Sequence, residues 1–164
     1  MDVTEQQLEA MAADLGAALQ RQGWMLATAE SCTGGWLAQV VTAIAGSSTW
    51  FDRGFVTYSN AAKQDMLDVR AETLAEFDAV SQETAREMVL GALAHSQAQV
   101  AIAITGIAGP GGGSAENPVG SVCFAWSVSG NSVASTLQHF EGDRRQIRVA
   151  SVAFALRQLL TLVP

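Results

Sequence analysis

Apolar residues recur along this chain at two spacings, one typical of helices and one typical of buried strands. Residues 4–22 have the helical spacing, and Gly23 follows them as a helix-ending residue. The apolar stripe consists of Leu8, Met11, Leu15, Ala18 and Leu19. Polar residues lie mostly off that stripe, so we predict an amphipathic helix that packs on the rest of the domain.

Short apolar runs predict five β-strands. The strands cover residues 24–29, 54–58, 99–104, 119–128 and 132–140. The run at 99–104 is nearly continuous, which is the pattern of a strand covered on both faces. The last two runs flank Gly130-Asn131, which predicts an antiparallel hairpin.

Helical spacing and capping residues predict further helices between the strands. These helices cover residues 36–45, 60–67, 71–98 in two pieces, and 143 to about 162. Asn60 is a good N-cap, which would put Lys63 at the third helical position. Ser81 and Asp143 can cap the later helices in the same way.

This order of elements predicts an α/β fold. Right-handed crossovers make the first three strands parallel, and the hairpin adds antiparallel pairing. We therefore predict a three-layer α/β/α domain over residues 1–164, with a mixed, mostly parallel five-stranded sheet of order 2-1-3-4-5. The carboxyl ends of the first three strands would then gather Ser31, Tyr58 and Thr105 at one edge, where ligands bind in such sheets.

Composition narrows the classes of function. The chain has 164 residues, 49% of them hydrophobic, which suits one domain with a proper core. Its net charge of −7 argues against nucleic acid as a partner, because that binding depends on clustered Lys and Arg. No apolar run approaches the roughly 20 residues of a membrane helix, and the N-terminal stretch lacks the pattern of a signal peptide. Cys32 and Cys123 make no disulfide framework, so we expect a cytoplasmic protein that does not bind membranes.

Ser31 is the first candidate for chemistry, because it follows a predicted strand and precedes a predicted helix. Thr33, Gly34 and Gly35 would leave backbone N–H groups free at the helix start, which suits an anion or a developing oxyanion. A hydroxyl in that position can be a nucleophile. The alternative is that Ser31 or Thr33 only caps the helix, and position alone favours the cap.

Lys63 is the second candidate, because it is the only lysine and the other eight basic residues are arginines. A lysine can be tuned to lose its proton, whereas arginine stays protonated. A cation in the first turn of a helix also opposes the helix dipole, and such rule-breaking positions are where function is worth suspecting. An ordinary exposed lysine remains the alternative.

Two further segments carry binding potential. The glycine-rich residues 105–113 follow a central strand and let backbone approach a ligand closely, although a flexible connector has the same composition. Arg144, Arg145 and Arg148 form the strongest local positive charge in an acidic chain, although they can also be a solvated helix face. His95 and His139 are isolated in sequence, so we expect no metal site.

Five blocks of sequence together resemble the CinA C-terminal domain family. The blocks are Glu30–Gly35, Gly54–Asn60 with Lys63, Thr105–Pro110, Pro118–Gly120 and Gly142–Arg144. The resemblance extends from about residue 5 to about residue 160, and the blocks occur in the family's order. One departure is the strand after the fourth block, which here contains Ser121, Cys123 and Trp126.

The resemblance implies an activity and a set of site residues. Stand-alone members of the family hydrolyse the carboxamide of nicotinamide mononucleotide (NMN) to nicotinic acid mononucleotide and ammonia, in bacterial pyridine-nucleotide recycling. By resemblance, Ser31 is the nucleophile, Lys63 and Tyr58 assist it, and no metal or organic cofactor takes part. The implied substrate-binding residues are Thr33, Gly34, Gly46, Ser48, Thr105, Gly106, Ala108, Gly109, Pro110 and Arg145.

In this assignment Arg145 would reach the nucleotide, with Arg144 and Arg148 as fallback candidates for the phosphate. An amide is a poor electrophile, and the sequence shows no Ser-His pair, so a Ser-Lys arrangement is the available catalyst. We also expect a homo-oligomer, such as a dimer. The competing interpretation is a module without catalysis, which either binds a nucleotide or serves a competence-related interaction.

Overall fold

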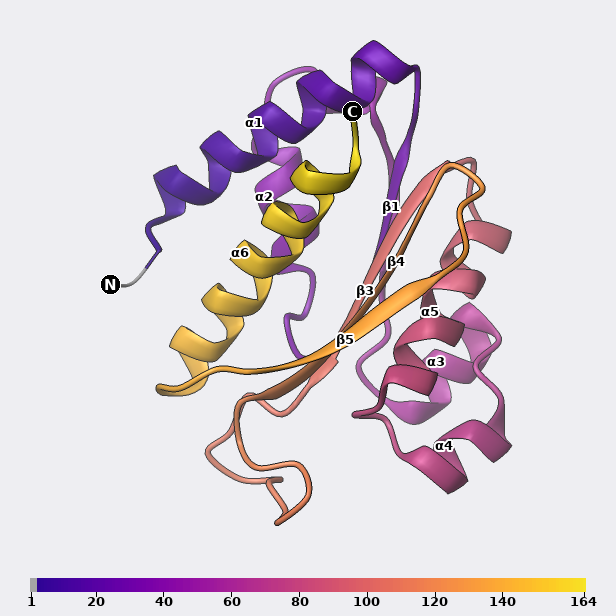
Figure 1. Ribbon diagram of the computed structural model, residues 1–164, viewed down its shortest axis with the longest axis vertical. Helices are drawn as coiled ribbons and strands as arrows, with labels where there is room; N and C mark the ends of the chain where they lie inside the picture. The colour runs from indigo at the N-terminus through magenta and orange to yellow at the C-terminus, as the bar shows by residue number, and fades with distance from the viewer. Residues whose placement is uncertain (1–2) are drawn as a thin grey trace.

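A five-stranded sheet forms the centre of the computed structural model, which describes residues 3–164 (Figure 1). Its strands are β1 (Leu26–Glu30), β2 (Phe51–Val56), β3 (Val100–Gly106), β4 (Ser121–Val128) and β5 (Ala134–His139). Their order is β2-β1-β3-β4-β5, with β1 parallel to β2 and β3, and with antiparallel pairing from β3 to β4 and from β4 to β5. The predicted fold class and strand order are therefore confirmed.

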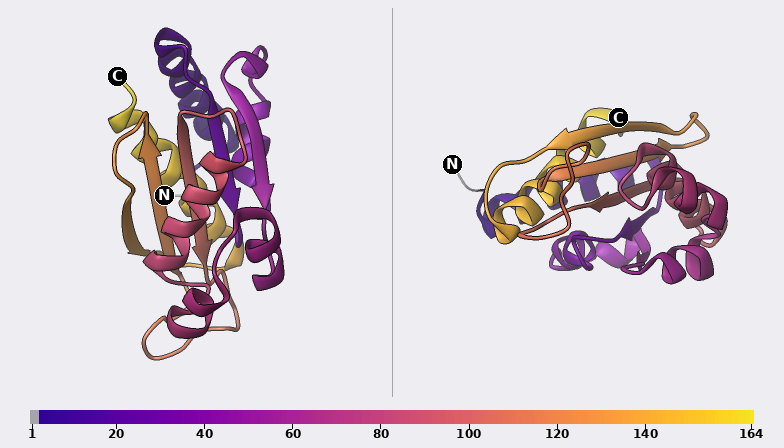
Figure 2. Two further views of the ribbon diagram at one scale, coloured as in Figure 1. Left: turned by 90° about the vertical axis from the view of Figure 1, so that its right-hand side faces the viewer. Right: turned by 90° about the horizontal axis from the view of Figure 1, so that it is seen from below.

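Helices cover both faces of this sheet (Figures 1 and 2). One layer contains α1 (Glu5–Gln22), α2 (Trp36–Thr42) and α6 (Arg144–Leu162). The other contains α3 (Asn60–Leu67), α4 (Ala71–Phe77) and α5 (Gln82–Ala94). A short 3₁₀ turn, η1 (Ser47–Thr49), leads into β2. Within residues 3–164, no helix combines the length and the apolar character that crossing a bilayer requires.

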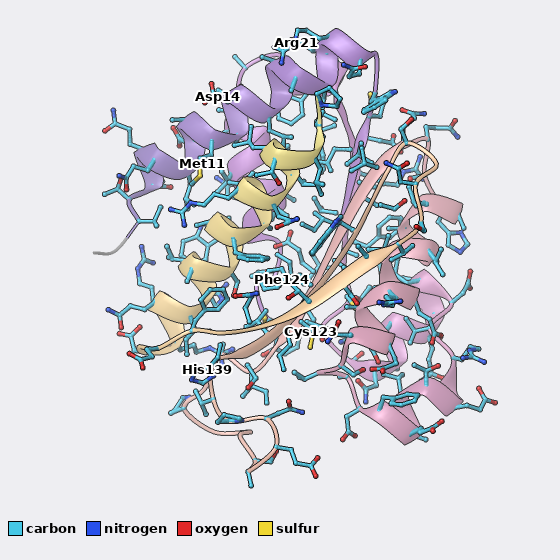
Figure 3. The ribbon with its side chains drawn as sticks, viewed as in Figure 1. Met11, Asp14, Arg21, Cys123, Phe124 and His139 are labelled. Atoms are coloured by element: carbon cyan, nitrogen blue, oxygen red, sulfur yellow. The ribbon has the colours of Figure 1, made fainter. Side chains whose placement is uncertain are left out.

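Alternation along the strands separates the interior into two cores, because successive side chains of a strand point to opposite faces. Leu26, Ile102 and Ile104 pack with α1, α2 and α6. The alanines between them, such as Ala27 and Ala103, face α5, and their small side chains let that helix lie close to the sheet. Figure 3 shows the same alternation on β4, where Phe124 points toward α6 and Cys123 toward the α3–α5 layer.

Several predicted boundaries shift by a few residues. The N-cap of α3 is Ser59, whose hydroxyl accepts the Ala62 amide, so the prediction of Asn60 was wrong by one position and Lys63 is the fourth helical residue. The helix at Trp36 ends at Thr42 rather than Ala45, and β2 begins at Phe51 rather than Gly54. Residue propensity alone predicts the ends of helices and strands poorly, because caps and tertiary contacts decide where an element ends.

Candidate active site

The turn after β1 carries Ser31 to the carboxyl edge of the sheet. Its amide donates to Ile104 O at 2.9 Å, which continues the pairing of β1 with β3 by one residue. The turn then passes through Gly34 and Gly35 with φ of 61° and 97°, a left-handed conformation that glycine adopts without strain. Ser31 is 8% exposed, so its hydroxyl lies in the protein but within reach of a ligand.

Glu30 caps the helix that follows this turn. Its carboxylate accepts the amide of Leu37 at 2.9 Å and that of Ala38 at 3.1 Å. The Gly34 amide donates to Ser31 O at 3.0 Å. The predicted set of free amides was therefore wrong for Gly34, because a tight turn uses that donor, and the first amides of α2 serve a carboxylate of this chain rather than a ligand.

Lys63 reaches Ser31 from α3. Its Nζ lies 2.9 Å from Ser31 Oγ, 2.8 Å from Thr57 O and 3.3 Å from Tyr58 O. The residue is only 1% exposed, and no ion pair within residues 3–164 includes it. The structure thus contains a buried lysine whose polar partners are one hydroxyl and two carbonyl oxygens.

Burial lowers the pKa of Lys63 from 10.5 to about 8, and the nearby Cys32 thiol opposes that shift. The neutral amine fits its surroundings, because it has two N–H donors for the two carbonyls and one lone pair for the Ser31 hydroxyl. Burial also raises the pKa of Cys32 to about 11, so the thiol beside Ser31 stays protonated. The Ser31 hydroxyl and the Lys63 amine are therefore the candidate nucleophile and base at this edge.

Tyr58 contacts this pair through its backbone. Its carbonyl lies 3.5 Å from Ser31 Oγ and also contacts Lys63. The residue as a whole is 64% exposed, and its phenol oxygen accepts a hydrogen bond from Arg144 Nη2 at 3.2 Å. The phenol therefore contacts α6, and the backbone carbonyl of Tyr58 contacts the amine. The assisting role of Tyr58 stays a prediction.

A cavity of about 260 Å³ opens beside the Ser31–Lys63 pair. It is lined by Ser31, Cys32, Tyr58, Lys63, Ala79, Val80, Thr105, Gly106, Ala108 and Arg144. The Thr105 hydroxyl donates to Ala79 O at 2.8 Å, which ties the end of β3 to the loop before α5. Larger hollows occur elsewhere, such as one of about 610 Å³ beside the β4–β5 hairpin, but their linings contain no paired nucleophile and base.

The three clustered arginines have different partners. Arg144 lines the cavity and donates to Gly109 O at 2.7 Å. Arg148 donates to Cys32 O and Thr33 O, both at 3.1 Å. Arg145 lies with its guanidinium carbon 5.3 Å from the centre of the Trp36 ring and is absent from the cavity lining. The structure therefore brings Arg144, rather than the predicted Arg145, to the cavity.

Gly46 and Ser48 are also separated from the cavity. They precede β2, and Trp50 O accepts the amide of Leu26, the first residue of β1. Because β1 and β2 run parallel, the residues before β2 lie at the amino edge of the sheet, whereas Ser31 lies at the carboxyl edge. The five residues of β1 span about 17 Å between these two edges. Within one chain these two residues therefore lie away from the cavity beside Ser31, and their role in substrate binding stays a prediction.

The remaining predicted residues lie around the turn that holds Ser31 and in the glycine-rich loop at residues 105–113. Gly106 and Ala108 line the cavity, Gly109 contributes the carbonyl that Arg144 holds, and Pro110 is exposed. Thr33 is fully buried, and its hydroxyl has no hydrogen-bond partner within residues 3–164.

Sequence reasoning missed Ala79 and Val80, because a loop between two helices carries no signal that it lies under the end of β3. The capping role of Glu30 was also missed, since a cap seven residues before its amide partner lies outside the usual capping patterns.

Metal-binding side chains do not gather at this edge. Across residues 3–164, no group of three His, Cys, Asp or Glu side chains is arranged to hold an ion. His95 instead pairs with Asp68 Oδ2 at 2.6 Å, outside the cavity.

Known proteins match this chain over nearly its full length. The model of the CinA C-terminal domain matches residues 8–163. The nicotinamide-nucleotide amidohydrolase PncC of Escherichia coli strain K12 is 49% identical over 157 residues, which are 96% of this chain and 95% of that protein. The protein of the same name from Enterobacter agglomerans is 48% identical over 158 residues, 96% of each chain.

Solved structures agree with these matches. The crystal structure of the competence/damage inducible protein CihA from Agrobacterium tumefaciens superposes with a TM-score of 0.92 at 47% identity, over 99% of this chain and 98% of that one. Fold, motif order and sequence identity thus lead to the same group of proteins. The chain belongs to the CinA C-terminal domain family.

Proposed function

We propose that this chain is a nicotinamide-nucleotide amidohydrolase that converts NMN to nicotinic acid mononucleotide and ammonia. The observation that carries the proposal is the buried contact of 2.9 Å between Lys63 Nζ and Ser31 Oγ beside a cavity. The names of relatives that are about half identical over nearly the whole chain support the choice of substrate. In this role the protein would act in the cytoplasm, in the recycling of pyridine nucleotides.

The first half of the reaction is acylation of Ser31. Neutral Lys63 accepts the hydroxyl proton while Ser31 Oγ forms a bond to the carboxamide carbon, which gives a tetrahedral oxyanion. The C–N bond then breaks, and the Lys63 ammonium returns its proton to the leaving nitrogen. Ammonia departs, and a nicotinoyl ester of Ser31 remains.

The second half removes that ester with water. Lys63 accepts a proton from the water while the water oxygen bonds to the ester carbon. The bond from that carbon to Ser31 Oγ then breaks, and the proton returns to Ser31 Oγ. Nicotinic acid mononucleotide leaves, and the neutral amine and the free hydroxyl are restored, so one lysine serves both halves in turn.

Arg144 is the group we assign to the phosphate of the substrate. Its guanidinium lies in the cavity lining and contacts Gly109 O and the Tyr58 phenol, both of which are neutral. A phosphate would offer it a charge-assisted, bidentate partner in a protein whose net charge is −7. This assignment replaces Arg145, which lies away from the cavity.

The decisive experiment is to incubate the purified protein with NMN and to measure ammonia by a coupled glutamate dehydrogenase assay. We expect ammonia and nicotinic acid mononucleotide in equal amounts from the wild type. We expect none from Ser31→Ala, which should still bind NMN in calorimetry.

Binding of NMN without ammonia release by the wild type would contradict the proposal and leave a nucleotide-binding module. An active Ser31→Ala variant would contradict the role of Ser31. The expected homo-oligomer is checked on the same preparation by light scattering.

A further inference from the structure

The turn between α4 and α5 has a backbone conformation that residues with a side chain disfavour. Asp78 follows α4 as its C-cap and has φ of 65° and ψ of 174°. This combination belongs almost only to glycine, and any other residue is strained in it. Such strain persists only where the surrounding structure enforces it, and it is concentrated at functional sites. The neighbours of Asp78 therefore show what the strain serves.

Two hydroxyls of the following helix hold Asp78 in this conformation. Its carbonyl accepts Ser81 Oγ at 2.9 Å and Thr84 Oγ1 at 2.7 Å. Thr84 is fully buried, so its hydroxyl is shielded from solvent. The Asp78 amide closes α4 by donating to Leu74 O at 3.0 Å. Asp78 is thus fastened to α4 through its amide and to α5 through its carbonyl.

The next two residues line the cavity of the candidate active site. They are Ala79 and Val80. Ala79 O accepts the hydroxyl of Thr105 at 2.8 Å, which places the turn beside the end of β3 (Figure 1). Asn117 Nδ2, from the loop between β3 and β4, lies 3.5 Å from Val80 O. Three consecutive carbonyls of the turn therefore have side-chain partners from three different parts of the fold, which leaves the turn little freedom to move.

This part of the cavity wall faces the ring of the substrate. In the proposed reaction Ser31 Oγ bonds to the carboxamide carbon, so the ring attached to that carbon lies in the same cavity. The cavity holds about 260 Å³, and its aliphatic side chains are those of Ala79, Val80 and Ala108. Small aliphatic side chains suit a flat ring. A close-packed wall that cannot move leaves no room for a larger one.

We propose that the turn of residues 78–80 is a rigid, specificity-determining wall, which admits the unsubstituted ring of NMN and rejects rings that carry an added methyl group. The inference rests on the proposed amide hydrolysis and adds to it the residues that decide which rings are accepted. Ala79 and Val80 form the wall, and the strained residue Asp78 fixes its position. In this role the turn acts on kcat/KM for one ring relative to another.

The first test compares NMN with analogues that carry a methyl group on a ring carbon. We expect the wild type to favour NMN over at least one analogue by about tenfold to a hundredfold in kcat/KM for ammonia release. Val80→Ala removes both methyl groups of that side chain, so kcat/KM for the rejected analogue should rise about tenfold relative to NMN. Thr84→Val keeps the shape but removes a donor to Asp78 O, so it should narrow the same ratio. Thr73→Val is the matched control, because Thr73 is also buried and its hydroxyl donates to Glu87 rather than to the turn.

The second test does not depend on turnover. Asp78→Gly and Asp78→Ala both remove the carboxylate, but only glycine adopts the observed conformation without strain. We therefore expect Asp78→Gly to have the higher Tm of the two, although glycine is normally the less stabilising residue. At Asp14, which is exposed on α1, the same pair of substitutions should give the opposite order.

The outcomes separate this inference from the proposed function. A wild type that releases no ammonia from NMN would contradict the proposed function itself. An active wild type that accepts every methylated analogue as well as NMN would overturn the wall alone. An unchanged ratio in Val80→Ala and Thr84→Val would overturn it too, as would a Thr73→Val variant that narrows the ratio as much as Thr84→Val. An Asp78→Gly variant no more stable than Asp78→Ala would show that the turn is unstrained, which also overturns the inference.

Discussion

At the scale of single residues, the site depends on a lysine without an acidic partner. Lys63 is buried, and its amine contacts Ser31 Oγ and the carbonyls of Thr57 and Tyr58. A carboxylate in that place would stabilise the ammonium form. Lys63 has no ion-pair partner within residues 3–164, so burial dominates and lowers the pKa of Lys63 to about 8. The surroundings of Lys63 therefore favour a base rather than a permanent charge.

This environment predicts how activity depends on pH. Only the neutral amine accepts the Ser31 proton, so kcat/KM should fall about tenfold per unit as the pH drops below about 8 and should level off above it. Lys63→Arg should lose about a hundredfold to ten-thousandfold, since a guanidinium keeps the charge but cannot act as a base. Ammonia release between pH 6 and 9.5 measures both, and a flat wild-type profile or a Lys63→Arg variant with most of its turnover would remove Lys63 from the role of base.

Arg144 gives a second prediction at this scale. If it holds the phosphate, Arg144→Ala should raise KM for NMN about tenfold to a hundredfold, which corresponds to about 1.5–3 kcal/mol for a charge-assisted contact. Nicotinamide riboside lacks the phosphate, so its KM should change far less. Tyr58→Phe is the control, because it removes the hydroxyl that Arg144 contacts and leaves the guanidinium in place. Equal losses on the two substrates would refute the phosphate contact.

At the scale of elements, helix α2 is fixed by a residue of the preceding strand. Glu30 is the last residue of β1 and is 1% exposed, yet its carboxylate accepts two amides from the first turn of α2. The strand, the turn with Ser31 and the helix thus form one hydrogen-bonded unit. A carboxylate at this position also suits the positive end of the helix dipole.

The cap predicts a stability effect. Glu30→Ala should lower the free energy of unfolding by about 2–3 kcal/mol, because it leaves two amides of α2 without their charged acceptor. Ser81→Ala, which removes the ordinary N-cap of α5, should cost only about 1 kcal/mol. Urea denaturation of the two variants makes the comparison, and a Glu30→Ala variant no less stable than Ser81→Ala would show that the carboxylate is not a strong cap.

At the scale of the whole molecule, the position of Lys63 depends on how α3 rests on α5. A Cβ added at Gly91 of α5 would lie 2.0 Å from Leu67 O, in the last residue of α3. The two helices therefore meet backbone to backbone at this point, and the contact sets how far α3 stands from the sheet. A shift of α3 would carry Lys63 away from Ser31.

This contact predicts an unusual cost for a favourable helix residue. Alanine normally stabilises a helix by about 1 kcal/mol relative to glycine, but Gly91→Ala should destabilise the protein by about 1–3 kcal/mol and reduce kcat. Gly111→Ala is the control, because a Cβ there meets nothing within 4 Å, and its stability should change by no more than about 0.5 kcal/mol. Thermal unfolding and ammonia release measure the two effects, and a stabilised, fully active Gly91→Ala would contradict the close packing.

Much of this arrangement follows from the sequence alone. Apolar periodicity predicted the helices, and Gly23 and Asp143 predicted the end of α1 and the start of α6. The right-handed crossover rule predicted the strand order that the structure confirms. The helix predictions and the strand-order prediction rest on local or nearly local effects. Apolar spacing, capping and the handedness of crossovers each act over one or two elements. The same reasoning placed Ser31 and Thr105 at one edge and drew attention to the only lysine.

Tertiary structure alone decided which side chains of each candidate group reach the cavity. Arg144 and Arg148 lie four positions apart and about 40° apart around the axis of α6, whereas Arg145 lies about 100° from Arg144. Arg145 instead shares the Trp36 ring with Arg148. The three arginines in the sequence do not reveal which side of α6 faces the turn that holds Ser31. Gly46 and Ser48 lie at the wrong edge because strand direction separates them from Ser31. Burial of Lys63 against Ser31 likewise requires α3 to be packed on α5, and contacts between distant segments exist only when the chain is folded.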